Sequence, residues 1–254
     1  VVTLASALKN IPDAQSKMYE CLGALVVEDT TITDANDAVH SMLNLRKALA
    51  VSCNITFARV AMELGDASLQ KTSSDFGIGD YFLFSDLVVQ NSAYPSVNRS
   101  LKELAWTGPG QSKLQLTPMH MALIASAIAN DGVMMEPRLL LDVTNNAGIS
   151  RYQFYGKEYK RVMNKQDADI IADYMQEAAR SGTATASAVS GLKIAGKTGS
   201  AQIDAQDQTN SWYIGFIDDA RYPYAVCVAI EDAGSGGSVA APIAGQLFKY
   251  LSGK

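Results

Sequence analysis

The sequence predicts an α+β fold in which a helical region precedes an antiparallel sheet. Apolar residues recur at helical spacing in several segments of residues 1–180, whereas residues 194–201, 212–217 and 224–230 are short extended runs. Turn residues separate the last two runs, as expected for a hairpin. The chain has 254 residues, 48% of them hydrophobic, which is enough for one enzyme-sized core, so we expect a single domain over residues 1–254.

Capping and breaking residues place the boundaries of the first helices. One helix is expected to end before Pro12, and Thr33 to Asn36 is expected to cap a second that continues through Leu49. A third helix is expected over residues 54–64, ended by a glycine. The segment from Ser52 to Asn54 therefore falls in a turn between two helices.

The middle of the chain combines a long loop with two further helices. Residues 76–109 alternate glycine, aromatic and polar residues without a sustained period, which indicates a loop with short extended pieces of the kind that often lines a site. Thr117 and the proline after it begin a strongly apolar helix that is expected to reach Asn130 and to be buried. An amphipathic helix is expected over residues 165–180, and a last helix over residues 242–251.

Charge and hydrophobicity exclude several classes of partner. The chain carries 21 basic and 26 acidic residues, and its net charge of −5 offers no electrostatic footprint for nucleic acid or for an anionic membrane surface. The longest apolar run, Met121 to Ala129, is far shorter than the roughly 20 residues of a membrane span. The first residues lack the basic segment of a signal peptide. We therefore expect small or peptidic partners.

The cysteines and histidines suggest neither a disulfide framework nor a metal site. Cys21, Cys53 and Cys227 are few and scattered, and no Cys-x-x-Cys or histidine-rich spacing indicates zinc. His40 and His120 each lie in an apolar context that resembles a helix, which argues against a catalytic triad with a histidine base. We expect no metal.

Residues 191–198 match the phosphate-loop pattern G-x-x-x-x-G-K-[ST]. Such a loop needs a buried strand before it and a helix after it, because backbone N–H groups and the helix N-terminus hold the phosphates. Here the preceding residues, Ala184 to Ser190, are small and polar, and another strand soon follows. The context argues against nucleotide binding, and no cofactor is expected.

From Lys197 onward the same residues form K-T-G, which lies on a strand facing the reactive serine in serine acyl-transferases of the penicillin-recognising superfamily. In that setting Lys197 places a cation beside the groove, and Thr198 offers a hydroxyl to a substrate carboxylate. Gly199 leaves room for substrate along the strand. The backbone N–H of Ser200 is then an oxyanion donor, a type of group worth about 3 kcal/mol of barrier.

A second motif of that superfamily, S-x-N, occurs at Ser52-Cys53-Asn54, before Lys197 in the chain and in the predicted turn between helices. In that role Ser52 relays a proton between the catalytic lysine and the leaving group, while the Asn54 amide binds the substrate backbone. Taken alone, the motif is more typical of a helix cap, in which Asn54 caps a helix that starts at Ile55. The order and setting of the two motifs together favour the catalytic interpretation.

The chain resembles the transpeptidase domain of penicillin-binding proteins, and the resemblance runs from end to end. The similar segments follow in family order: Ser52 to Phe57, Gly110-Gln111, Leu116 to Ala122, Ile128 to Gly132, Ser181 to Ala184, Gly196 to Gln202, Trp212 to Phe216 and Ala240 to Ile243. The chain is most similar to the monofunctional, class B type, including mycobacterial and clostridial elongation or sporulation transpeptidases.

This resemblance implies a fold and an activity. The fold is an antiparallel β-sheet flanked by helices plus an all-helical lobe, with the site between the sheet edge and that lobe. The implied activity is cross-linking of D-Ala-D-Ala-ended peptidoglycan stem peptides through a serine acyl-enzyme, with β-lactams as covalent inhibitors. The implied partners include cell-wall elongation or division proteins, and the implied location is the extracytoplasmic face of a bacterial membrane, with an anchor outside this chain.

One expected motif is absent. Members of the family carry S-x-x-K, followed by a helix that resembles the segment after Val1, so the nucleophile and its lysine are expected immediately before Val1. Ser6 to Lys9 formally satisfies S-x-x-K. However, the motif should open its helix, with the lysine one turn after the serine, whereas Ser6 is expected well inside one. The site residues expected in this chain are therefore Ser52, Asn54, Lys197, Thr198, Gly199 and Ser200.

Two alternatives share these motifs. A class A serine β-lactamase needs a loop glutamate near an asparagine to activate water, and Glu103 has no such asparagine beside it. A non-enzymatic β-lactam sensor would retain Lys197, Ser52 and Asn54 without turning over a peptide donor. The sequence favours the transpeptidase over both.

Overall fold

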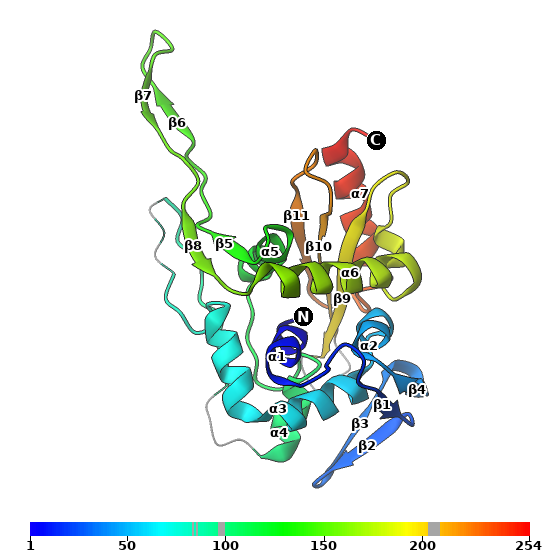
Figure 1. Cartoon of the computed structure of the whole chain (residues 1–254). Coiled ribbons are helices and arrows are strands. Elements are labelled where there is room, and N and C mark those ends of the chain that lie inside the picture. Colours follow the sequence, from blue (N-terminus) through cyan, green and yellow to red (C-terminus); the bar gives the residue numbers. More distant parts are fainter. Residues whose placement is uncertain (83, 85, 96–99, 203–208) are drawn as a thin grey trace.

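The computed structural model describes residues 1–82, 84, 86–95, 100–202 and 209–254 (Figure 1). Its helices are α1 (Val2–Asn10), α2 (Leu45–Val51), α3 (Asn54–Asp75), α4 (Leu101–Thr107), α5 (Pro118–Ala129), α6 (Lys165–Ser181) and α7 (Ala240–Ser252), with short 3-10 helices at Ala35–Asp37 and Thr185–Ser187. The longest strands are β9 (Ile194–Gln202), β10 (Thr209–Ile217) and β11 (Ala225–Ile230), which form an antiparallel sheet in the order β11-β10-β9.

Helices cover both faces of this sheet. Tyr213 and Ile217 of β10 point to the face packed by α7, and Ile214 and Phe216 point to the opposite face, packed by α5. The alternation follows from the two-residue period of a strand, and all four side chains are buried. Helix α6 packs against β9 and crosses it in the view of Figure 1. The sheet is therefore a buried layer, and β9 is its edge strand among the described residues.

Helices α1, α3 and α4 form a separate lobe below the sheet in Figure 1, and α2 joins this lobe to α6. Short strand pairs decorate the body: β1 (Tyr19–Cys21) with β4 (Ser41–Leu43), β2 (Ala24–Val27) with β3 (Thr30–Thr33), β5 (Val133–Met135) with β8 (Glu158–Arg161), and β6 (Asp142–Thr144) with β7 (Ser150–Gln153). The β6–β7 hairpin projects away from the rest of the molecule. No helix of the described residues has the length and apolar character that crossing a bilayer requires.

Most predicted elements are confirmed, because local signals define their ends. Thr117 caps α5 by accepting a hydrogen bond from the His120 N–H, and Pro118 occupies the first turn. Helix α6 ends at Ser181 with Gly182 after it, and the three strands at the C-terminal end lie where extended runs were expected. The predicted α+β fold class, with its antiparallel sheet and helical lobe, is likewise confirmed.

The predicted helix from Thr33 through Leu49 is wrong over most of its length. Thr33 ends β3, a 3-10 helix follows, and β4 pairs with β1 before α2 begins at Leu45. Asn44 is the actual cap, since its side chain accepts a hydrogen bond from the Lys47 N–H at 3.0 Å. Thr30–Thr33 forms a strand because Ile32 is buried against the helical lobe while its neighbours face outward.

Two further boundaries differ from prediction. Gly65 interrupts the third helix, with φ 73° and ψ 162°, but the helix resumes and continues to Asp75. The predicted loop over residues 76–109 contains α4, which begins with a capping box between Ser100 and Glu103. Residues 83, 85 and 96–99 of that predicted loop lie outside the described residues.

Candidate active site

The turn that carries Ser52 joins α2 to α3, as predicted. Ser52 ends α2 in the left-handed region, with φ 58° and ψ 45°. Cys53 is the N-cap of α3, because its sulfur accepts a hydrogen bond from the Thr56 N–H at 3.3 Å. Asn54 is thus the first residue of α3 and not its cap, so the simple capping explanation of the motif is wrong.

Asn54 is held from two directions by the segment that follows β3. Its backbone N–H donates to the Asp34 carboxylate, and its side-chain amide donates to the Thr33 carbonyl oxygen at 3.0 Å. The Asp34 carboxylate is buried, with the side chain 2% exposed. The amide group of Asn54 therefore has a defined orientation before any ligand arrives.

Lys197 projects from the middle of β9 to the Ser52 turn. Its ammonium nitrogen donates to the Ser52 hydroxyl at 2.8 Å and to the Thr198 carbonyl oxygen at 2.6 Å. Burial lowers the pKa of Lys197 from 10.5 to about 8. Ser52 and Lys197, which the sequence predicted as site residues, are thus in direct contact. The lowered pKa of Lys197 makes proton transfer by this side chain easier near neutral pH.

The strand setting of Lys197 also confirms the argument against a phosphate loop. Lys197 lies inside a nine-residue strand, and no helix follows it among the described residues up to Gln202. Gly196 is packed so closely on the Tyr213 ring that a Cβ would lie 2.2 Å from the phenol oxygen. An extended strand of this kind does not form a backbone cradle for phosphates.

Thr198 is connected to the segment that follows α6. Its hydroxyl shares a 2.6 Å hydrogen bond with that of Thr183, whose N–H donates to the Ala50 carbonyl oxygen at 3.0 Å. The neighbouring Gly182 has no room for a side chain, because a Cβ would lie 2.1 Å from the same carbonyl oxygen. The segment after α6 thereby ties β9 to α2, the helix that ends at Ser52.

Gly199 and Ser200 are fixed by contacts on two sides. The Ser200 carbonyl oxygen accepts from the Gln111 side chain at 2.9 Å, and its hydroxyl accepts from the Gly236 N–H at 3.1 Å. A Cβ on Gly236 would lie 2.4 Å from the Gly199 carbonyl oxygen. Sequence reasoning gave no site role to Thr183, Gln111 or Gly236. The sequence shows that these three residues lie in segments of small or polar residues. It does not show that the three segments meet at β9.

A buried carboxylate joins α2 to α6 on the side away from Ser52. Glu177 is 4% exposed and accepts hydrogen bonds from Ser181 at 2.7 Å and Lys47 at 3.1 Å. Arg180 also donates to it, and Arg46 lies 3.4 Å away. The Ser181 hydrogen bond, followed by that of Lys47, holds the pKa of Glu177 down at about 2. We refer to these five residues as the Glu177 cluster.

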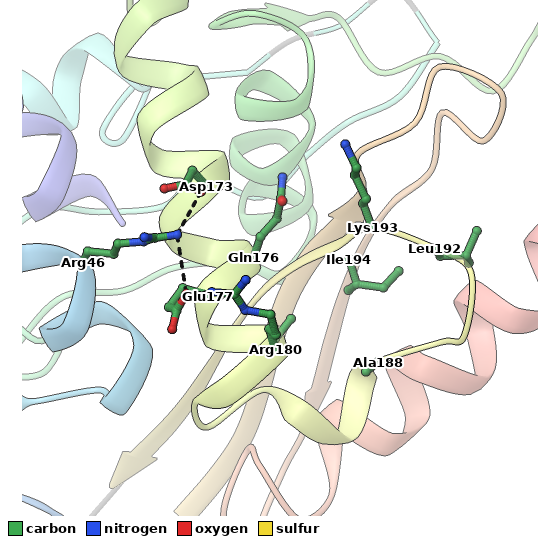
Figure 2. Close-up of a pocket in the computed structure, with 10 residues that line it drawn as sticks. Arg46, Asp173, Gln176, Glu177, Arg180, Ala188, Leu192, Lys193 and Ile194 are labelled. Atoms are coloured by element: carbon green, nitrogen blue, oxygen red, sulfur yellow. Dashed lines mark hydrogen bonds and ion pairs between the residues drawn. The ribbon is translucent and has the colours of Figure 1, made fainter.

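Figure 2 shows part of the Glu177 cluster beside a hollow of about 270 Å³ lined by α6 and by residues 188–194. None of the predicted site residues lines this hollow. Arg46 reaches across it from α2 toward Asp173 and Glu177. The hollow is part of a structural junction, and the site lies at the other end of α2.

The other residues considered from sequence have structural surroundings. Ser6 is fully buried in α1, and its hydroxyl accepts from Thr72 of α3 at 3.0 Å, while Lys9 pairs with Asp75 at 3.1 Å. His120 is buried, and its Nε2 lies 2.9 Å from the Phe76 carbonyl oxygen. The structure therefore gives no support to Ser6 as a nucleophile or to His120 as a base.

His40 differs from its prediction. It lies outside any helix, just before β4, and its Nδ1 is 3.1 Å from the Asp34 carboxylate. Cys21 and Cys53 adjoin the same carboxylate, so two cysteines that are scattered in the sequence converge in space. The sequence showed no Cys-x-x-Cys or histidine-rich spacing, and that spacing could not reveal that these side chains lie together in the fold.

Comparison with known proteins decides the family. A sequence profile of the penicillin binding protein transpeptidase domain matches residues 1–249. The chain belongs to this family. Among curated relatives of this transpeptidase domain, peptidoglycan D,D-transpeptidase PbpA of Mycolicibacterium smegmatis is 30% identical over 210 residues, which is 79% of this chain and 42% of that protein. The chain thus spans less than half the length of this relative.

Solved structures place the penicillin-binding transpeptidase fold on the whole chain. The D,D-transpeptidase domain of a peptidoglycan glycosyltransferase from Eggerthella lenta is 28% identical, with a TM-score of 0.89, and the match covers 98% of this chain and 63% of that one. The penicillin G acyl-enzyme complex of penicillin-binding protein A from M. tuberculosis is 25% identical, with a TM-score of 0.88, and the match covers 100% and 59%. The class B resemblance inferred from the motifs is confirmed.

Within this transpeptidase domain, Glu103 stabilises the start of a helix, whereas a deacylating glutamate would have to be free to activate water. It accepts from the Ser100 N–H to complete the capping box of α4, and it pairs with Lys113 at 2.8 Å. Its side chain is thus committed to the start of a short helix. The structural role of Glu103 supports the sequence argument against a class A β-lactamase.

Proposed function

We propose that this chain is part of the transpeptidase domain of a peptidoglycan D,D-transpeptidase that cross-links D-Ala-D-Ala stem peptides and is acylated by β-lactams. The observation that carries the proposal is the 2.8 Å hydrogen bond from Lys197 on β9 to Ser52 in the helical lobe. A related protein is named a peptidoglycan D,D-transpeptidase, and another was solved as a penicillin G acyl-enzyme. A strand-borne lysine against a serine in a turn is suited to proton transfer during acyl transfer.

In this proposal a serine hydroxyl attacks the carbonyl between the two D-alanines, and its proton passes to the lysine of a Ser-x-x-Lys motif. The terminal D-Ala leaves as an amine after the C–N bond breaks, and Ser52 delivers the proton that this amine needs. Lys197 donates a hydrogen bond to Ser52, so it can restore that proton. An acceptor amine then attacks the acyl-enzyme carbonyl and the C–O bond to the serine breaks; the proton of the amine returns through Ser52 to Lys197, and the serine recovers its own proton from the lysine of Ser-x-x-Lys.

The remaining site residues hold the donor peptide. Thr198 offers its hydroxyl to the terminal carboxylate, and the Lys197 charge lies beside it. Gly199 leaves space for the peptide along the edge of β9, the backbone N–H of Ser200 stabilises the oxyanion, and the Asn54 amide binds the peptide backbone. The support for these roles is their common placement along β9 and the Ser52 turn.

We propose that the nucleophilic serine belongs to a Ser-x-x-Lys segment directly preceding Val1. The support is the family pattern, in which a helix follows Ser-x-x-Lys: Val1 is the N-cap of α1, and α1 packs against α3 and α6. This arrangement supplies a nucleophile that Ser6, buried against α3, cannot.

The cellular setting follows from the same reasoning. Transpeptidation of peptidoglycan occurs outside the cytoplasm, so we place the protein at the extracytoplasmic face of a bacterial cell membrane. Proteins of cell-wall elongation or division complexes are the proposed partners, and nucleic acid is not a proposed partner because the chain carries a net charge of −5.

The test uses the full-length protein and a chromogenic β-lactam. A transpeptidase should release about one equivalent of product in a burst and then stall. It should also transfer the acyl-D-Ala group of a thioester donor to the amine of an added D-amino acid. Sustained hydrolysis at the burst rate would identify a β-lactamase instead. A stable adduct without any transfer to the amine would identify a sensor, and either outcome would overturn the proposal.

A further inference from the structure

Four side chains that can bind a metal converge beneath the Ser52 turn. The carboxylate Oδ2 of Asp34 lies 3.0 Å from the Cys21 sulfur, 3.2 Å from the Cys53 sulfur and 3.1 Å from His40 Nδ1. His40 Nδ1 and the Cys21 sulfur are 3.5 Å apart. All four donor atoms lie within 4.8 Å of one another. We call these four residues the Asp34 cluster.

The Asp34 cluster is assembled from four separate segments. Cys21 ends β1, Asp34 follows β3, His40 precedes β4 and Cys53 caps the start of α3. The two cysteines are fully buried and Asp34 is 4% exposed, while His40 is partly exposed at the edge. The β1–β4 and β2–β3 pairs are only three or four residues long, and so short a strand pair holds its shape poorly alone. The cluster lies where the two small sheets meet α3.

The donor set and its spacing fit zinc. Two thiols, one imidazole and one carboxylate are ligands that Zn²⁺ accepts in four-coordinate, closed structural sites. Metal–donor bonds of about 2.0–2.3 Å in a tetrahedron place donor atoms roughly 3.3–3.8 Å apart. Four of the six donor pairs are 3.0–3.5 Å apart and no pair exceeds 4.8 Å, so the side chains would close around an ion with small shifts in both directions. Four ligands leave no open position for substrate, so the geometry favours a structural site.

We propose that Cys21, Asp34, His40 and Cys53 bind one Zn²⁺ ion, which fixes the turn that carries Ser52 and Asn54. Cys53 lies between these two residues in the chain, and Asp34 has two carboxylate oxygens with separate tasks. Oδ2 faces the cluster, and Oδ1 accepts the Asn54 N–H. A metal bound to Asp34 and Cys53 would therefore hold the turn from both its backbone and its side chains.

The metal site stands on the Asp34 cluster alone, whereas its positioning role rests on the proposed function of Ser52. In that role the zinc touches no substrate. The ion keeps Ser52 within hydrogen-bond distance of Lys197. Loss of the ion should lower the rate of acylation more than it weakens initial binding of a β-lactam. This division allows the metal site and the catalytic proposal to fail separately.

The first measurement is metal content. Full-length protein purified without chelators should contain about one zinc ion per chain by elemental mass spectrometry. Cys21→Ser and His40→Ala should lose most of that zinc, whereas Cys227→Ser, which removes the third cysteine outside the cluster, should retain it. Zinc equally retained in the two cluster variants would overturn the proposal.

A second measurement does not depend on the variants folding. Wild-type protein stripped with a strong chelator is titrated with Co²⁺ and then with Zn²⁺. The expected results are a thiolate-to-cobalt charge-transfer band, tetrahedral visible bands, their displacement by one equivalent of zinc and a rise in melting temperature. Failure to bind either ion, or a Cys21–Cys53 disulfide in the intact mass, would show a hydrogen-bonded or oxidised cluster and would overturn the proposal.

The last measurement separates the positioning role from the proposed function. The stripped and zinc-restored proteins are compared in single-turnover acylation by a fluorescent penicillin. A lower rate constant without zinc, at similar initial affinity, supports the positioning role. An acylation rate constant that is the same in the stripped and the zinc-restored protein would overturn that role. Zinc binding without any adduct would instead contradict the proposed function and leave the metal site supported.

Discussion

Lys197 and Ser52 are 145 residues apart in the chain, and the ammonium nitrogen of the first donates a 2.8 Å hydrogen bond to the hydroxyl of the second. The lysine belongs to the edge strand of the sheet and the serine to a turn of the helical lobe. Two connections hold these parts together: Thr183 links β9 to α2, and Glu177 links α6 to α2. The hydrogen bond therefore reports the alignment of the two halves of the site.

The pKa of Lys197 predicts an alkaline limit to acylation. Because burial lowers this pKa to about 8, the lysine loses its proton as the pH rises through 8, and the cation that faces Ser52 and the substrate carboxylate disappears. The rate of acylation by a penicillin should fall over that range. In Lys197→Arg the guanidinium stays charged, so the fall should vanish below about pH 10, whatever the absolute rate. An identical alkaline fall in both proteins would contradict the assignment.

The left-handed backbone at Ser52 predicts that activity and stability separate. Both Ser52→Gly and Ser52→Ala remove the hydroxyl, so each should lower the acylation rate by about 10²–10⁴-fold. Only glycine adopts φ 58° without strain, so the glycine variant should be about 1 kcal/mol more stable than the alanine variant. Equilibrium denaturation checks the difference, and an alanine variant as stable as the glycine variant would show that the turn is not left-handed.

The Glu177 cluster predicts a pH-dependent contribution to folding. The pKa of Glu177 is lowered from 4.5 to about 2 in the folded protein, so its stabilisation is fully present above pH 4.5 and is lost as the pH falls toward 2. Glu177→Gln should destabilise the protein by about 2 kcal/mol at pH 7 and by much less near pH 2. Chemical denaturation at several pH values measures the difference.

Asp169→Asn is a matched control for Glu177. Asp169 lies on the same helix and pairs with Lys165, but its side chain is 60% exposed. Because solvent screens an exposed pair, the control should change stability by less than about 0.5 kcal/mol at any of these pH values. Equal effects of the two substitutions would mean that the buried carboxylate has no special role in holding α2.

The parts of the fold that sequence predicted are those with local signals. Thr117 and its proline define the start of α5, and the short extended run predicted over residues 194–201 is β9. The turn at Ser52 was predictable for the same reason, since a helix-forming segment lies on each side of it. In each case the deciding information lay within a few residues.

The parts that sequence missed depend on contacts between distant segments. The β1–β4 and β2–β3 pairs form because they cover α3 and α4, so Thr30–Thr33 becomes a strand despite a capping pattern at its end. His40 joins Cys21, Asp34 and Cys53 through these same pairs, and no short spacing in the sequence reveals that meeting. Glu177 lies inside the predicted helix over residues 165–180, and Thr183 lies just after it. The sequence does not show that these residues contact α2 and β9.

The central claim is that Ser52 and Lys197 act as one proton-relay unit, and a double-mutant cycle on penicillin acylation tests it most directly. We predict that Ser52→Ala and Lys197→Ala each lower the second-order rate constant in the full-length protein by about 10²–10⁴-fold. The double variant should be little slower than the slower single variant, because a unit can be broken only once. The exposed Ser16→Ala should leave the rate unchanged. Effects that multiply in the double variant, as for independent residues, would contradict the account.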